Sequence, residues 1–194
     1  HIFPVEKYKL VKKFLLEKNL PLDEFISSPE ATLAQIKLVH THTFLSRIED
    51  YIFRNPFEAV MEFEALCDMD VYDAFKRMCG ATLLAGRLAL ENKTFGFHIG
   101  GGFHHSFRDH GEGFCILNDI AVAIEVLRKE GLVRKIAVID VDVHQGNGTA
   151  SIFEEDADVF TFSIHNEMIY PLAKMRSNID IGLPMGAGDR EYLM

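Results

Sequence analysis

Cysteine is scarce in this sequence. The three cysteines, Cys67, Cys79 and Cys115, are odd in number, widely spaced and form no CxxC pair. This pattern favours reduced thiols over a disulfide framework. We therefore expect a cytoplasmic protein, or a nuclear one if the source is eukaryotic.

The sequence also has no long apolar run, and it carries fewer positive than negative side chains. No apolar run approaches the roughly 18 to 20 residues needed to span a bilayer, so we expect no membrane helix and no membrane partner. Lys and Arg number 20 against 29 Asp and Glu, which gives a formal net charge of −9. This balance argues against direct nucleic-acid binding and would suit a basic partner such as a lysine-rich peptide. The oligomeric state stays open.

The chain contains no internal repeat, low-complexity tract or Pro/Gly/Ser-rich linker. Its 194 residues, 48% of them hydrophobic, can bury a sizeable core and fit one domain or a large part of one. Because the first residue is His1, we expect the native N-terminus to lie upstream. The lack of a signal peptide is then uninformative.

The first half of the sequence has a helical pattern. Pro4 can occupy the first turn of a helix, and apolar residues then recur at three- and four-residue spacing through Leu15. Further helices are predicted over 43–51 and 71–90, the second with a broad apolar face that includes small residues.

The second half changes period. Short, apolar runs predict strands over 95–99, 135–141 and 159–164, with a helix over 119–129 and a short helix before the last strand. This order predicts parallel strands joined by crossovers, hence an α/β fold with a mostly parallel central sheet flanked by helices. In such sheets ligands gather at the carboxyl ends of the strands.

The stretch DVDVHQGNGT, residues 140–149, follows one predicted strand. If the extended conformation persists, alternation sends Asp140, Asp142 and His144 to one side. A carboxylate and an imidazole at i and i+2 are suitable zinc ligands. The alternative is a polar strand end whose carboxylates cap a helix or pair with arginine.

The stretch GGGFHHSF, residues 100–107, places His104 and His105 after another predicted strand. Adjacent loop histidines are often simply solvated. A pair at the same sheet edge as a metal site would instead supply the base that metal-assisted hydrolysis needs.

A third stretch, GEGFCILND, residues 111–119, combines a tight turn with the start of a helix. Phe114 is interpreted either as an apolar wall beside the site or as core packing. Asn118 is predicted to cap the helix that begins at Asp119. Cys115 is expected to be a buried small residue, since no activating base can be assigned to it.

These three motifs, GGGFHH, GEGFCILNDIA and IDVDVHQGNGT, together resemble the zinc-dependent histone deacetylase superfamily in order and spacing. The likeness extends over 1–194 and implies a three-layer, arginase/deacetylase-like fold of which only the N-terminal part is present. HQGNG in place of the commoner HHGDG, with Ile169-Tyr170-Pro171 downstream, looks more like the class IV branch and its bacterial relatives.

The resemblance implies a role for each matching position. Asp142 and His144 would be two of three zinc ligands, and His104 and His105 the tandem histidines around the water and the acyl carbonyl. Asp140 would orient His104, and Asn147 stands where many members have an aspartate that orients the second histidine. The remaining implied positions are the acyl-lysine tunnel (Gly113, Phe114, Tyr170) and a structural potassium ion (main-chain oxygens of Asp140, Asp142, His144 and Ile164, with the Ser163 side chain).

The family pattern is incomplete within this chain. Its third zinc ligand, an aspartate in a Gly-Ala-Asp-like motif, and its oxyanion-stabilising tyrosine have no counterpart after Ser177. Asp180 and Asp189 match surface connections and are not assigned as ligands. The resemblance therefore implies a partial deacetylase-like domain over 1–194, lacking the C-terminal part and inactive as this segment alone.

The resemblance implies a zinc-dependent hydrolase of an acylated lysine, acting through metal-activated water and the tandem histidines. Two alternatives stay open: a non-catalytic binding or scaffold module on the same fold, and an acetylpolyamine amidohydrolase. An arginase-like binuclear manganese site is disfavoured, because Gln145 and Asn147 are neutral. The acyl chain length is not determined, although the class IV likeness favours longer chains.

Overall fold

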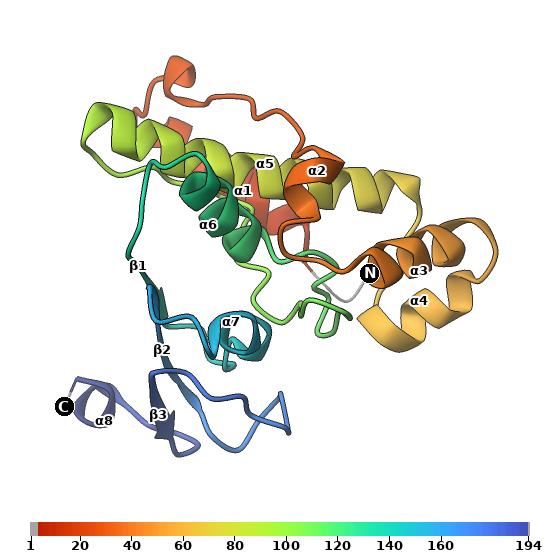
Figure 1. The fold of residues 1–194 in the computed structure, drawn as a ribbon. Coiled ribbons are helices and arrows are strands. Elements are labelled where there is room, and N and C mark those ends of the chain that lie inside the picture. The colour runs from red at the N-terminus through yellow and green to blue at the C-terminus, as the bar shows by residue number, and fades with distance from the viewer. Residues whose placement is uncertain (1–3, 194) are drawn as a thin grey trace.

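The computed structural model describes residues 4–193. A helical part precedes a small parallel sheet (Figure 1). The elements in chain order are α1 (Glu6–Glu17), η1 (Leu22–Glu24), α2 (Leu33–Ile36), α3 (His42–Phe53), α4 (Pro56–Phe63), α5 (Met69–Asn92), α6 (Asp119–Lys129), β1 (Ile136–Asp140), α7 (Asn147–Phe153), β2 (Val159–Asn166), β3 (Ile179–Leu183) and α8 (Asp189–Tyr192).

The predicted helices are present. The helix predicted over 43–51 is α3, that over 71–90 is α5, and that over 119–129 is α6. The first helix begins at Glu6, so Pro4 precedes it and accepts a hydrogen bond from the Lys7 N–H instead of occupying the first turn. No helix among residues 4–193 is long and apolar enough to cross a membrane.

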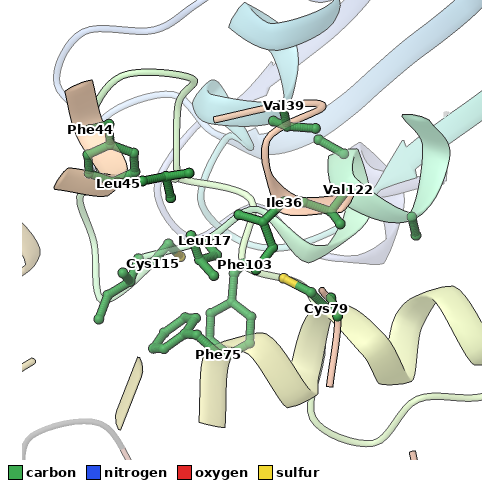
Figure 2. Close-up of a cluster of buried hydrophobic side chains, with 14 of the residues drawn as sticks. Ile36, Val39, Phe44, Leu45, Phe75, Cys79, Phe103, Cys115, Leu117 and Val122 are labelled. Atoms are coloured by element: carbon green, nitrogen blue, oxygen red, sulfur yellow. The ribbon is translucent and has the colours of Figure 1, made fainter. Parts of the chain in front are cut away.

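The helical part holds the main core. Helix α5 packs against α6 (Figure 1), and its side chains also meet the loop before the tandem histidines. Figure 2 shows Phe75 and Cys79 of α5 beside Phe103 of that loop, with the Phe75 and Phe103 ring centroids 4.6 Å apart. This apolar contact fixes the loop one residue before the tandem histidines.

The sheet is parallel with strand order β1-β2-β3, which confirms the predicted α/β class. Register partners Val138 and Thr161 lie on the side that faces the helices, and the predicted short helix, α7, contacts β2. On the opposite side Ile139 and Phe160 are exposed within the described residues. The expected flanking by helices is thus present here on one face.

The strand predicted over 95–99 is wrong. This segment has no strand partner among residues 4–193 and runs along α5 as irregular chain, where a side chain on Gly96 would collide with the Ala85 carbonyl. Phe95 and Phe97 remain 87% and 76% exposed. An apolar run becomes a strand only where another strand offers hydrogen bonds, and this run meets a helix.

Asn118 caps α6 as predicted, since its Oδ1 accepts the Ala121 N–H at 2.9 Å. Its Nδ2 donates to the Ser106 carbonyl and to Thr149 Oγ1, both at 3.0 Å. One buried amide therefore joins the start of α6 to the loop after the histidines and to α7.

Candidate metal centre and tandem histidines

The tandem histidines face the last residue of β1 and the first residue of α7. His104 Nδ1 lies 2.6 Å from Asp140 Oδ2, and His105 Nδ1 lies 2.7 Å from Asn147 Oδ1. Both imidazoles are buried, with ring centroids 4.1 Å apart. The structure brings together the four residues that the sequence assigned to acid–base chemistry; their catalytic roles stay predictions.

The buried Asp119 carboxylate holds the Gly-rich segment that precedes these histidines. Asp119, at the start of α6, accepts the Phe103 N–H at 2.8 Å, the Gly102 N–H and the Thr82 hydroxyl. The His104 carbonyl in turn accepts the Thr149 N–H of α7 at 3.0 Å. Positions 102 to 104 are thus fixed from both sides by main-chain hydrogen bonds.

The proposed zinc ligands converge by a turn and not by strand alternation, which corrects the prediction. Strand β1 ends at Asp140. The chain then bends, with the Asp142 N–H donating to Asp140 Oδ1 at 3.0 Å and the His144 N–H donating to Asp142 Oδ1 at 2.8 Å. Short carboxylates accept such local hydrogen bonds readily and so favour turns over continued strand.

The spacing of this pair fits a zinc ion. Asp142 Oδ1 and His144 Nδ1 are 3.3 Å apart. Two ligands at about 2.0 to 2.2 Å from a tetrahedral zinc stand about 3.3 to 3.6 Å from each other. Among residues 4–193 no group of three or more His, Cys, Asp or Glu side chains could hold a metal. A catalytic zinc takes three protein ligands, and the assignment of Asp142 and His144 as two of them stays a prediction.

The two later aspartates have other positions. Asp180 lies in β3 and not in a surface connection, which corrects the prediction; it accepts hydrogen bonds from Gln145 Nε2 and the Ser177 N–H. Asp189 begins α8. The sequence did not predict β3, because the polar segment 177–180 at its beginning overlaps residues that precede Ile179 and resembles a loop.

The electrostatic environments of the two histidines differ. Burial, then the charge of His104, lowers the pKa of His105 to about 4. Burial also acts to lower the pKa of His104, but the hydrogen bond and charge of Asp140 outweigh it and raise that pKa above its usual value. Near neutral pH His105 is therefore neutral, whereas His104 is the more easily protonated of the two.

The three predicted tunnel residues lie beside the histidines. Gly113 and Phe114 form the turn of a small antiparallel bridge between Glu112 and Cys115, with φ of +55° and +65°. A side chain on Gly113 would stand 2.7 Å from the His105 ring and 3.0 Å from that of Tyr170. This glycine therefore permits the close approach of the turn to the site.

Tyr170 packs edge-on against the rings of His105 and His144. Its ring centroid lies 5.0 Å from that of His105 and 6.0 Å from that of His144. Burial and the neighbouring Glu112 carboxylate raise the pKa of the Tyr170 hydroxyl. Tyr170 thus remains a neutral wall of the site, and the contact of these walls with an acyl chain stays a prediction.

Two of the predicted potassium positions, Ser163 and Ile164, lie on β2, the strand next to β1. Ser163 is the register partner of Asp140, and Ile164 follows it in β2. The Ser163 hydroxyl lies 2.9 Å from His165 Nδ1. Potassium binding here stays a prediction.

Sequence reasoning missed two residues of the site. Glu112 accepts a hydrogen bond from Asn147 Nδ2 at 2.5 Å, and Gln145 bonds to both main-chain groups of Met175. A charged residue between two glycines was the available signal for Glu112. Gln145 had no comparable signal, because its partner lies 30 residues away.

Known proteins resemble this chain over its whole length. The histone deacetylase domain matches residues 1–194. An uncharacterized protein of Picosynechococcus is 37% identical over this whole chain and 64% of its own length, and histone deacetylase 2 of Arabidopsis thaliana is 31% identical over this whole chain and 52% of its own. A crystal structure of a histone deacetylase homologue from Aquifex aeolicus superposes with a TM-score of 0.81 at 27% identity, covering 95% of this chain and 55% of that one.

The chain belongs to the histone deacetylase domain family. It spans about half to two thirds of the length of these relatives. The match confirms the resemblance drawn from the three sequence motifs, and the partial span agrees with a partial domain.

Proposed function

We propose that the intact protein is a zinc-dependent deacylase that hydrolyses the amide of an acylated lysine. One observation carries this proposal: a carboxylate and an imidazole 3.3 Å apart, Asp142 and His144, stand beside two buried histidines that are each held at Nδ1. Metal-assisted hydrolysis needs this combination of ligands and a positioned base.

Asp142 and His144 would hold the zinc together with a third ligand from outside residues 4–193. When bound, zinc polarises the amide carbonyl and lowers the pKa of water to about 7. His105, neutral and held at Nδ1 by Asn147, presents Nε2 to the site.

His105 takes a proton from the attacking water as the water oxygen bonds to the carbonyl carbon. The same proton then passes to the amine nitrogen as the carbon–nitrogen bond breaks, which leaves a carboxylic acid and a free amine. His104, backed by Asp140, stabilises the negative charge that builds on the carbonyl oxygen.

The substrate class follows from charge and shape. The formal net charge of −9 suits a basic peptide that carries the acyl-lysine, and an acetylated polyamine is the second substrate of the same chemistry. Gly113 and Tyr170 limit the width of the approach to His105. We propose these residues and Phe114 as the acyl-lysine walls.

The test is turnover of the zinc-loaded intact protein on peptides with acyl-lysines of increasing chain length and on acetylpolyamines. D142N and H144Q should abolish turnover and reduce bound zinc. The matched controls are D109N and H110Q, because Asp109 and His110 form an exposed pair 2.8 Å apart that is not part of this site. Equal loss in both pairs of variants would contradict the assignment of the metal site.

Two alternatives give different results. A scaffold module would bind acyl-lysine peptides without hydrolysing them. An arginase-like enzyme would bind two metal ions per chain, but the side chains of Gln145 and Asn147 are neutral and already hydrogen-bonded to other groups.

A structural potassium at Ser163 and Ile164 and a cytoplasmic or nuclear location complete the proposal. The strand register supports the first, since it places Ser163 beside Asp140. The three buried free thiols suit a reducing compartment.

A further inference from the structure

The partner of His105 is an amide, which leaves a chemical question open. An aspartate at position 147 could only accept a hydrogen bond from His105. An asparagine can turn its amide and present either the oxygen or the NH2 group. With the NH2 group toward His105, Nδ1 would have to accept, the ring proton would move to Nε2, and the nitrogen facing the site would lose its lone pair.

A carboxylate removes this ambiguity. Glu112 Oε1 lies 2.5 Å from Asn147 Nδ2, on the far side of the amide from His105. Because a carboxylate only accepts, the NH2 group must face Glu112 and the oxygen must face His105. The oxygen then accepts from His105 Nδ1, so the ring proton resides there.

We propose that Glu112 is a positioning residue that acts through Asn147 to hold the proton of His105 on Nδ1 and leave Nε2 free as the base. This assignment rests on the proposed function and deepens it. Glu112 does not contact the reacting atoms. An aspartate at position 147 would always accept the hydrogen bond from His105. Through its own hydrogen bond to Asn147, Glu112 makes the asparagine accept in the same way.

The fold holds Glu112 in this place. Its carbonyl accepts the Cys115 N–H at 2.9 Å across the turn at Gly113 and Phe114, and the Phe114 N–H donates to the Phe63 carbonyl of α4 at 3.0 Å. Phe114 has a φ of +65°, which is unfavourable for a bulky residue. Such a conformation persists only where the surroundings enforce it, and it occurs often at functional sites.

We expect a crossed pattern among three variants. E112Q is isosteric, but the new amide at position 112 and the Asn147 amide can turn together, so the proton of His105 is no longer fixed and kcat should fall about 10- to 100-fold, as for other partners that orient site residues. N147D alone sets two carboxylates against each other and should also lower kcat. In E112Q/N147D the new carboxylate at position 147 accepts from both of its neighbours, so kcat should recover above either single variant while KM changes little.

The control for loss of charge near the site is E64Q, because Glu64, like Glu112, raises the pKa of Tyr170 by its charge but bonds to neither Asn147 nor His105. It should retain the wild-type kcat. A purely structural role of Glu112 predicts additive losses in E112Q/N147D, and that result would overturn the assignment.

The second measurement needs no turnover. Nitrogen-15 NMR of the histidine-labelled, zinc-loaded intact protein at a pH of about 8, above the ordinary histidine pKa, reads which ring nitrogen carries the proton, with His105 assigned from an H105Q spectrum. We expect Nδ1–H in the wild type, an Nε2–H population in E112Q and a return to Nδ1–H in E112Q/N147D. An unchanged spectrum in E112Q would overturn the role of Glu112, whereas a wild type without deacylase turnover would refute only the proposed function.

Discussion

Replacing Asn118 with alanine should destabilise the protein strongly, because this buried side chain makes three hydrogen bonds. Loss of the cap at the start of α6 costs about 1 kcal/mol. Loss of the bonds to the Ser106 carbonyl and Thr149 Oγ1 costs roughly 1 kcal/mol each, since both partners lie in a buried environment. The expected total is about 3 kcal/mol.

The assay is equilibrium urea unfolding of the intact protein followed by far-ultraviolet circular dichroism. Asn118→Asp separates the two roles, since a carboxylate keeps the capping acceptor but loses both donors and buries a charge. It should cost at least about 2 kcal/mol. Asn92→Ala is the matched control, because Asn92 is exposed and its side chain donates to the Leu88 carbonyl of its own helix. It should stay within about 0.5 kcal/mol of the wild type.

Wild-type stability in Asn118→Asp would refute this reasoning. It would mean that the cap alone matters and that the bonds to Ser106 and Thr149 contribute nothing. A large loss in Asn92→Ala would instead point to a general effect of removing amides from helices.

Three other predictions concern the histidines and the turn beside them. His105→Ala should lower kcat about 100- to 10,000-fold with little change in KM, and near-normal kcat would exclude it as the base. Burial lowers the pKa of His40 to about 4, so below a pH of about 6.5 the unfolded state binds a proton that the folded state does not. The free energy of unfolding should therefore fall by about 2 kcal/mol between pH 7 and pH 5. Urea titrations should show a smaller loss in His40→Gln, which keeps an acceptor for the Asn118 N–H, and an identical loss in that variant would contradict the role of His40. Gly113→Ala should lower the free energy of unfolding by about 1 kcal/mol, because the φ of this residue is +55°. It should also lower kcat, because the new methyl group would press on His105. Unchanged unfolding and kinetics would show that the turn is not tightly packed.

Local patterns predicted the helices α3, α5 and α6, and the family resemblance predicted the pairing of each histidine with its partner. The helices follow from apolar periodicity, and the Asn118 cap follows from its place directly before an apolar face. His104 and His105 were assigned to Asp140 and Asn147 by the family resemblance, and the structure places both pairs within hydrogen-bond distance.

What could not be predicted depends on contacts between distant segments. The run over 95–99 has the composition of a strand, yet it lies against α5 because no strand pairs with it among residues 4–193. Asp142 and His144 meet through carboxylate–main-chain hydrogen bonds that bend the chain, which strand alternation does not include. Glu112 reaches Asn147 across 35 residues, and only the folded chain shows that contact.

The most direct test of the central claim is a zinc titration of the chelator-stripped intact protein, with release of acetate from an acetyl-lysine peptide as the readout. We predict no turnover without metal and full recovery at one zinc per chain, with recovery absent in H144Q. Turnover that persists without metal, or that recovers equally in H144Q, would contradict the assignment of Asp142 and His144 as ligands of a catalytic zinc.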